Sequence, residues 1–70
     1  MSPEQQMSLW VFMVLDAYAR QHRFSARQAA DFAVENHIPG FLLGNYELLH
    51  YYGDDYVVQD IDRWLAEDAA

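Results

Sequence analysis

The sequence lacks cysteine and lysine altogether, and its only four cations are arginines among 70 residues. Without cysteine the chain can form neither disulfides nor thiolate metal sites, so its stability must come from packing or from association. The scarcity of cations disfavours nucleic acid and anionic membrane surfaces as partners, because binding to both depends on positive charge. A chain this short forms one domain, residues 1–70, and it buries only about 60% of its unfolded surface, so it is marginally stable alone.

Long hydrophobic runs are also missing. The apolar stretch at residues 7–15 falls short of the ~20 residues that a membrane span requires. Glu4 precedes this stretch and no cation does, whereas a secretory signal peptide begins with a cationic region. These features predict a cytoplasmic protein without a membrane partner.

The residues that are present are apolar, aromatic and acidic. Hydrophobic residues make up 53% of the chain and aromatic residues 16%, which is too apolar for a disordered acidic tail. The net charge is −7. A charge of this sign favours a basic protein partner and a fast association that salt weakens.

Two capping boxes predict the starts of the first two helices. Ser2 is followed three residues later by Gln5, and Ser25 is followed in the same way by Gln28. We expect the first helix to run to about residue 22 and the second to about residue 36. The first helix is apolar on nearly every side, so it is either central to the fold or has one face against a second chain.

The second half of the chain predicts one or two further helices. Residues 38–40, with sequence Ile-Pro-Gly, are expected to break the chain. Residues 41–52 are interpreted as a third helix, although Gly44 and Asn45 inside it leave open a turn in which Asn45 caps a shorter helix. His50, in the last turn, is expected to cap backbone carbonyls and to be structural.

Gly53 is a typical helix terminator, and a fourth helix is expected to begin at Asp54 or Asp55. Acidic residues suit that position because they complement the positive end of the helix dipole. A strand at residues 56–58 would have no visible partner. We therefore predict an all-α fold, a compact domain of three or four helices.

Other classes of function find little support. A DNA-recognition helix at residues 41–52 would contain no arginine or lysine, and only Asn45 has a side chain suited to reading bases. The apolar residues 56–58 interrupt the aspartates and the glycine precedes them, unlike in a calcium-binding loop, and no two histidines are four residues apart. His22 lies three residues before Ser25, but no carboxylate is obviously placed to orient it. We expect no catalytic residues, no metal, no cofactor and no small-molecule substrate.

Aromatic and acidic residues concentrate between residues 47 and 68, where seven acids and one cation give a local charge of −6. Adjacent tyrosines at a helix end cannot both point into one core, so one of them lies flat on the surface or both serve an interface. We predict that this edge binds a protein partner or a second copy of the chain. The predicted partner-binding residues are Tyr51, Tyr52, Asp54, Asp55, Asp60 and Asp62.

The last third of the chain also carries a motif. Tyr46-x-x-Leu49-His50 is followed by Gly53 and then by Tyr-Val-Val-Gln-Asp-Ile at residues 56–61. This pattern resembles a family of small bacterial domains of unknown function, and the resemblance covers roughly residues 8–65. It implies no catalytic residues. It also implies an antitoxin-like role, since members of the family often look like partners of neighbouring genes, including ADP-ribosyltransferase-like toxins.

Two other functions remain open from the sequence. The chain could be a structural subunit or a homo-oligomerising domain, which predicts an apolar interface that tolerates salt. It could instead be an anti-defence protein whose acids imitate nucleic-acid phosphates, which predicts binding that salt abolishes.

Overall fold

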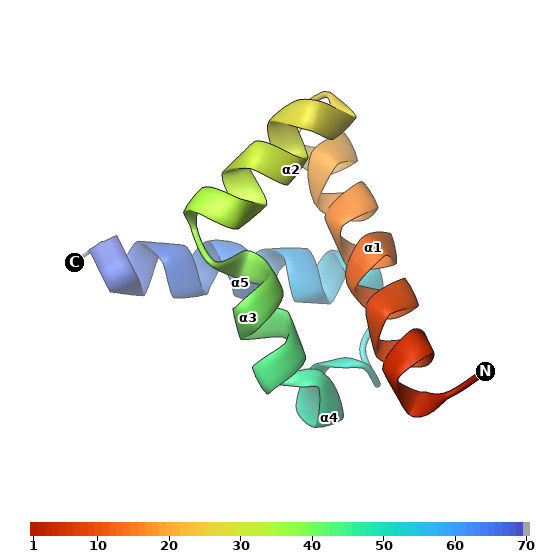
Figure 1. Cartoon of the computed structure of the whole chain (residues 1–70). Helices are drawn as coiled ribbons and strands as arrows, with labels where there is room; N and C mark the ends of the chain where they lie inside the picture. The colour runs from red at the N-terminus through yellow and green to blue at the C-terminus, as the bar shows by residue number, and fades with distance from the viewer. Residues whose placement is uncertain (70) are drawn as a thin grey trace.

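Five helices follow one another in the computed structural model, which describes residues 1–69 (Figure 1). No strand occurs within those residues, and residues 56–58 are helical, so the all-α prediction is confirmed. The sequence predicted three or four helices, so the described residues contain one helix more than the larger of these numbers. They are α1 (Pro3–His22), α2 (Ala26–Glu35), α3 (Ile38–Gly44), α4 (Tyr46–Leu49) and α5 (Asp54–Ala69).

Both predicted capping boxes are present. The Gln5 backbone N–H donates to Ser2 Oγ (3.2 Å), and the Ser2 backbone N–H donates to Gln5 Oε1 (2.9 Å). The same reciprocal pair joins Ser25 and Gln28 at 3.1 and 2.8 Å. These local hydrogen bonds satisfy N–H groups that the first turn of a helix leaves without partners, and they fix where α1 and α2 begin.

The break after α2 lies earlier than the sequence predicted. Asn36 ends α2, and His37 takes the left-handed conformation with φ 57°. Ile38 and Pro39 then form the first turn of α3, so the prediction of a break at residues 38–40 is wrong. Proline is accommodated there because the first helical positions need no backbone donor.

The prediction of one helix over residues 41–52 is also wrong. Asn45 separates α3 from α4, and its side-chain Nδ2 donates to the Phe41 carbonyl (2.8 Å). Asparagine competes with helical hydrogen bonding in this way, and the preceding Gly44 has a low helix propensity. His50 follows α4, and its Nδ1 lies 2.6 Å from the Tyr46 carbonyl, the capping contact expected of it.

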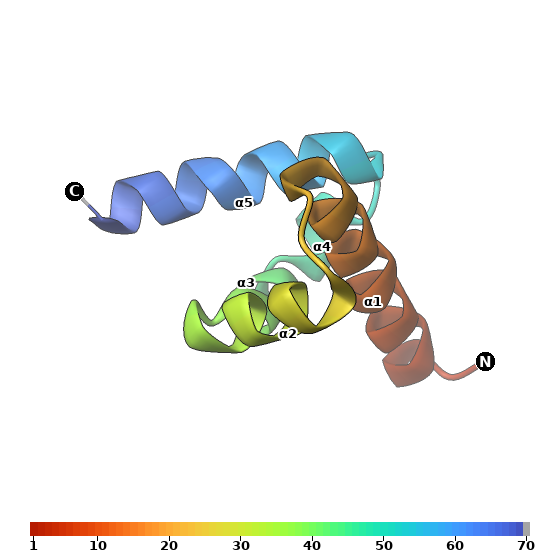
Figure 2. The same cartoon turned by 90° about the horizontal axis from the view of Figure 1, so that it is seen from above.

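The helices surround a single apolar core. In Figure 1, α1 and α2 form a V, and α5 passes behind the other helices. Seen from above, α5 lies on one side, α2 and α3 lie on the other, and α1 joins the two sides (Figure 2). Among the buried side chains in the described part of the chain, Tyr18 alone carries a polar group, its hydroxyl. The most deeply buried large side chains are Val14, Ile38, Leu42, Val57, Val58 and Ile61.

Candidate functional site

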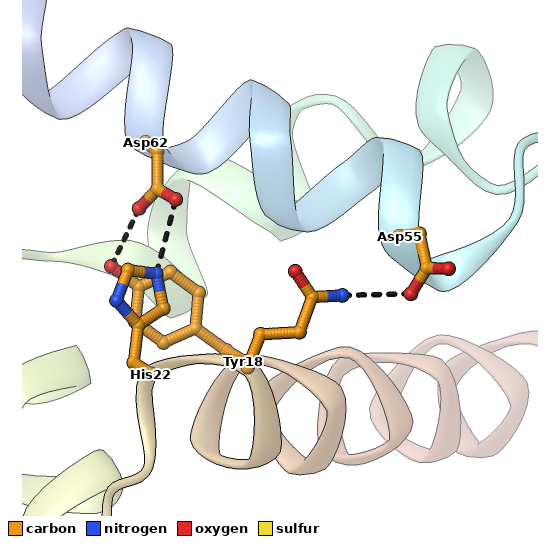
Figure 3. A network of polar contacts seen from close by, with 5 residues as sticks. Tyr18, His22, Asp55 and Asp62 are labelled. Carbon is orange, nitrogen blue, oxygen red and sulfur yellow. Dashed lines mark hydrogen bonds and ion pairs between the residues drawn. The ribbon is translucent and has the colours of Figure 1, made fainter.

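A polar cluster joins the first helix to the last (Figure 3). The Tyr18 hydroxyl donates to Asp62 Oδ1 (2.9 Å), and His22 Nε2 lies 3.0 Å from Asp62 Oδ2. The rings of Tyr18 and His22 are stacked with centroids 4.1 Å apart. Burial, together with the hydrogen bond to Asp62, raises the pKa of Tyr18 above its ordinary value. A single carboxylate therefore fastens two residues of α1 to α5.

A second contact between α1 and α5 lies closer to the start of α5. Gln21 Nε2 donates to Asp55 Oδ1 over 2.7 Å (Figure 3). Asp54 and Asp55 occupy the first turn of α5, where carboxylates complement the helix dipole. Both aspartates line a shallow surface hollow together with Ala17, Arg20 and Gln21.

The adjacent tyrosines both lie outside the core. Tyr51 is 79% exposed and Tyr52 is 48% exposed. The ring of Tyr52 stacks on Tyr56 at 4.3 Å, and the ring of Tyr51 packs on His50 at 4.1 Å. We call the surface at the junction of α4 and α5 the tyrosine edge. Its members are exposed and apolar or aromatic: Leu48, Tyr51, Tyr52 and Tyr56.

The four predicted aspartates do not share one surface. Asp60 lies one turn after Tyr56 on the same face of α5, and it pairs with Arg63 Nη1 at 3.0 Å. Asp55 and Asp62, seven residues apart, lie on the face that meets α1. The structure thus leaves Tyr51 and Tyr52 exposed, places Asp60 beside Tyr56, and engages Asp55 and Asp62 in contacts with α1.

Sequence reasoning missed the partner of His22. We expected no carboxylate to orient this ring, but Asp62, forty residues later, is in contact with it. No short-range spacing in the sequence predicts a contact between two residues that are forty positions apart. The Asp62 carboxylate also accepts from the hydroxyl of the buried Tyr18, so the three side chains together join α1 to α5.

Tyr56 and Leu48 are the members of the tyrosine edge that the sequence prediction omitted. Leu48 is 68% exposed and Tyr56 is 43% exposed. A signal for Tyr56 existed, because it stands four residues before Asp60 and therefore on the same side of a helix. For Leu48 no signal existed, since its neighbour Leu49 is equally apolar and yet is buried.

A second exposed apolar surface lies on α1. We call it the α1 outer face, formed by Leu9, Phe12 and Met13, which are 48%, 70% and 50% exposed. The opposite side of α1 buries Val14 and Tyr18 in the core. The first helix is thus central on one side and leaves an apolar face uncovered on the other.

Residues 1–69 contain neither a metal-ligand cluster nor a membrane-spanning helix. Within this part of the chain no three histidine, aspartate or glutamate side chains are grouped so that they could hold a metal ion. None of the described helices combines the length and the apolar character needed to cross a membrane.

Comparison with known proteins identifies one relationship. A family model described as "Protein of unknown function (DUF3791)" matches residues 10–68, which includes the whole tyrosine edge and the Tyr18–His22–Asp62 cluster. No curated protein and no solved structure matches the chain.

Proposed function

The chain belongs to this family of proteins of unknown function, DUF3791, and on that premise we propose that it is a non-enzymatic protein-interaction module. It binds a more basic protein through the tyrosine edge. The observation that carries this proposal is the exposure of Tyr51 and Tyr52. The ring of Tyr51 nevertheless packs on His50, and the ring of Tyr52 stacks on Tyr56.

Stacked, exposed rings suit binding because they offer a large apolar area that loses little conformational freedom on association. A ring such as Tyr52, already packed on Tyr56, is close to the conformation it would hold in a complex. Aromatic side chains of this kind are enriched among the few residues that dominate the binding energy of an interface.

The charge around the edge favours a basic partner. Residues 47–68 contain seven acids against one arginine. Asp60 lies one turn after Tyr56 and is offset by Arg63, and Asp54 stands two residues after Tyr52 in the first turn of α5. Such a field accelerates the encounter with a positively charged surface more than it strengthens the final complex.

The more specific form of the proposal is that the domain has an antitoxin-like role. The basic partner is then a harmful protein encoded by a neighbouring gene, and the domain neutralises it by covering a cationic surface. The resemblance of the motif around His50 and Asp60 to toxin-associated small domains supports this form. It requires that the neighbouring gene product arrests growth when it is expressed alone.

The test measures binding kinetics between the full chain and the purified neighbouring gene product. Replacing Tyr51 and Tyr52 together by Ala should weaken binding by about 2 kcal/mol or more, roughly 30-fold, mainly through faster dissociation. The matched control is Val34→Ala, because Val34 on α2 is 71% exposed and lies outside the edge. Wild-type affinity in the tyrosine variant would remove this surface from the proposal.

A second pair of substitutions distinguishes the contribution of the aspartate charges to binding from that of the tyrosine rings. Asp54→Asn with Asp60→Asn should slow association and flatten its dependence on salt while leaving dissociation nearly unchanged. Asp55 and Asp62 are unsuitable because they hold α1 against α5. If the aspartate variant loses all binding and the tyrosine variant loses none, the domain is an acidic mimic of nucleic acid.

A further inference from the structure

The α1 outer face is an apolar surface without a partner in the fold. Phe12 is 70% exposed, although phenylalanine is usually buried. Leu43 of α3, 45% exposed, lines a small hollow together with Phe12, Ser8 and Val11, so the apolar area continues beyond α1. Contiguous apolar surface of this kind marks an interaction site.

The charge on this half of the chain differs from that around the tyrosine edge. Residues 1–46 contain four acids and three arginines, which leaves −1 of the total −7. Beside the α1 outer face, Asp16 and Arg20 form an exposed ion pair at 3.3 Å. A second copy of this acidic chain can therefore approach here without the like-charge repulsion that it meets at the tyrosine edge.

The order of side chains along α1 is complementary to itself. Every fourth residue of α1 lies on a ridge that winds slowly around the helix, and this ridge carries Glu4, Ser8, Phe12, Asp16 and Arg20. Glu4, Ser8, Leu9 and Phe12 also line one surface hollow, which confirms that they are neighbours. Reversing this row about Phe12 places Glu4 opposite Arg20 and Ser8 opposite Asp16.

We propose that two copies associate as a symmetric dimer through their α1 outer faces, with the helices antiparallel and the two-fold axis at Phe12. Each Phe12 then packs against its counterpart, and Leu9 and Met13 enclose the rings. Each Glu4 faces Arg20 of the partner subunit. A symmetric interface of this type uses the same patch twice, and two such ridges lie alongside each other when the helices cross at about 50°.

The dimer goes beyond the proposed function because it uses no residue of the tyrosine edge. It would present two such edges in one particle. A partner with two binding surfaces, or two partners held close together, would then be bound with an affinity raised by linkage.

The test is the mass of the full chain by sedimentation over a wide range of concentrations. Wild type should change from monomer to dimer as concentration rises, and Phe12→Glu should remain monomeric, with affinity reduced at least 100-fold. Val34→Glu is the matched control, since Val34 is 71% exposed against 70% for Phe12, and it should dimerise as wild type does. Circular dichroism of each variant establishes that it is folded.

Charge exchange tests the antiparallel arrangement. Arg20→Glu alone should weaken the dimer because two acids then face each other, and combining it with Glu4→Arg should restore most of the lost affinity. Wild type that stays monomeric throughout, a dimer that survives Phe12→Glu, or a failure of the double exchange to restore association would each overturn the proposal. The Tyr51 and Tyr52 double variant should still dimerise, which separates this result from the test of partner binding.

Discussion

Asp62 illustrates how much of the fold one partly exposed side chain can hold. Its two oxygens accept from Tyr18 and contact His22, residues 44 and 40 positions earlier in the chain. The Tyr18 side chain is almost fully buried, so its hydroxyl would have no acceptor if the carboxylate were removed.

We therefore expect Asp62→Ala to lower the free energy of unfolding by about 1–3 kcal/mol, the usual cost of removing a charged hydrogen-bond partner. Chemical denaturation measures this. Asp60→Ala is the control two residues away, because Asp60 pairs with Arg63 of the same helix, whose side chain is 59% exposed, and such a pair should contribute less than about 1 kcal/mol. Equal losses for the two variants would show that Asp62 does not join α1 to α5.

Tyr18 gives the protein a dependence on alkaline pH. Since the folded state raises the pKa of this phenol above its ordinary value of 10.0, the stabilisation is complete below pH 10.0 and declines as pH rises further. The slope from this group is at most about 1.4 kcal/mol per pH unit. Tyr18→Phe should cost about 1 kcal/mol near neutral pH and should make unfolding less sensitive to pH above 10.0. Parallel pH profiles for the two proteins would contradict this account.

At the scale of the helices, the same device ends three elements. Asn36, Asn45 and His50 follow α2, α3 and α4, and each directs a side-chain nitrogen to the carbonyl four residues earlier, at 2.9, 2.8 and 2.6 Å. Each of these carbonyls also accepts the backbone N–H of the same residue, so the side chain adds a second bond at the end of the helix. The side chains thus reinforce the last turns of three short helices.

The end of α1 uses a different and more strained device. Arg23 takes the left-handed conformation with φ 58°, and the Phe24 N–H donates to the Ala19 carbonyl at 2.8 Å. Glycine is the usual residue at this position because it has no Cβ to clash. We predict that Arg23→Gly stabilises the fold by about 0.5–1 kcal/mol, measured by thermal or chemical unfolding.

The control for this prediction is the same substitution four residues later. Arg27 lies in the first turn of α2, where the backbone is helical, so Arg27→Gly should destabilise the fold by about 0.5–1 kcal/mol. A loss of stability in both variants would mean that the conformation of Arg23 carries no strain.

Helix starts could be predicted from the sequence better than helix ends. A capping box is a contact over three residues, so Ser2 and Ser25 show it in the sequence itself. The break at Asn45 could not be decided, because glycine and asparagine are tolerated both within a helix and at its end. The roles of Asp55 and Asp62 depend on the packing of α5 against α1, which no local pattern contains.

The whole molecule exposes two surfaces, the tyrosine edge and the α1 outer face. The proposed association through the α1 outer face predicts how the protein unfolds on heating. If α1 outer faces associate, the midpoint of thermal unfolding should rise with protein concentration, because the dimer forms only from folded chains. Phe12→Glu should abolish that dependence and Val34→Glu should keep it. Scanning calorimetry over a hundredfold range of concentration is the measurement. A midpoint that does not change with concentration in wild type would contradict association of the folded chains.

The contacts between α1 and α5 also bear on the order in which the chain folds. The helices α1 to α4 can meet through short connections, whereas α5 reaches α1 only by closing a loop of several tens of residues, which is the slower kind of contact to form. During synthesis, the core therefore stays incomplete until Val57, Val58 and Ile61 leave the ribosome and α5 docks against α1. This partly folded nascent chain is the state most susceptible to aggregation and to proteases, and slower translation of α5 would prolong it.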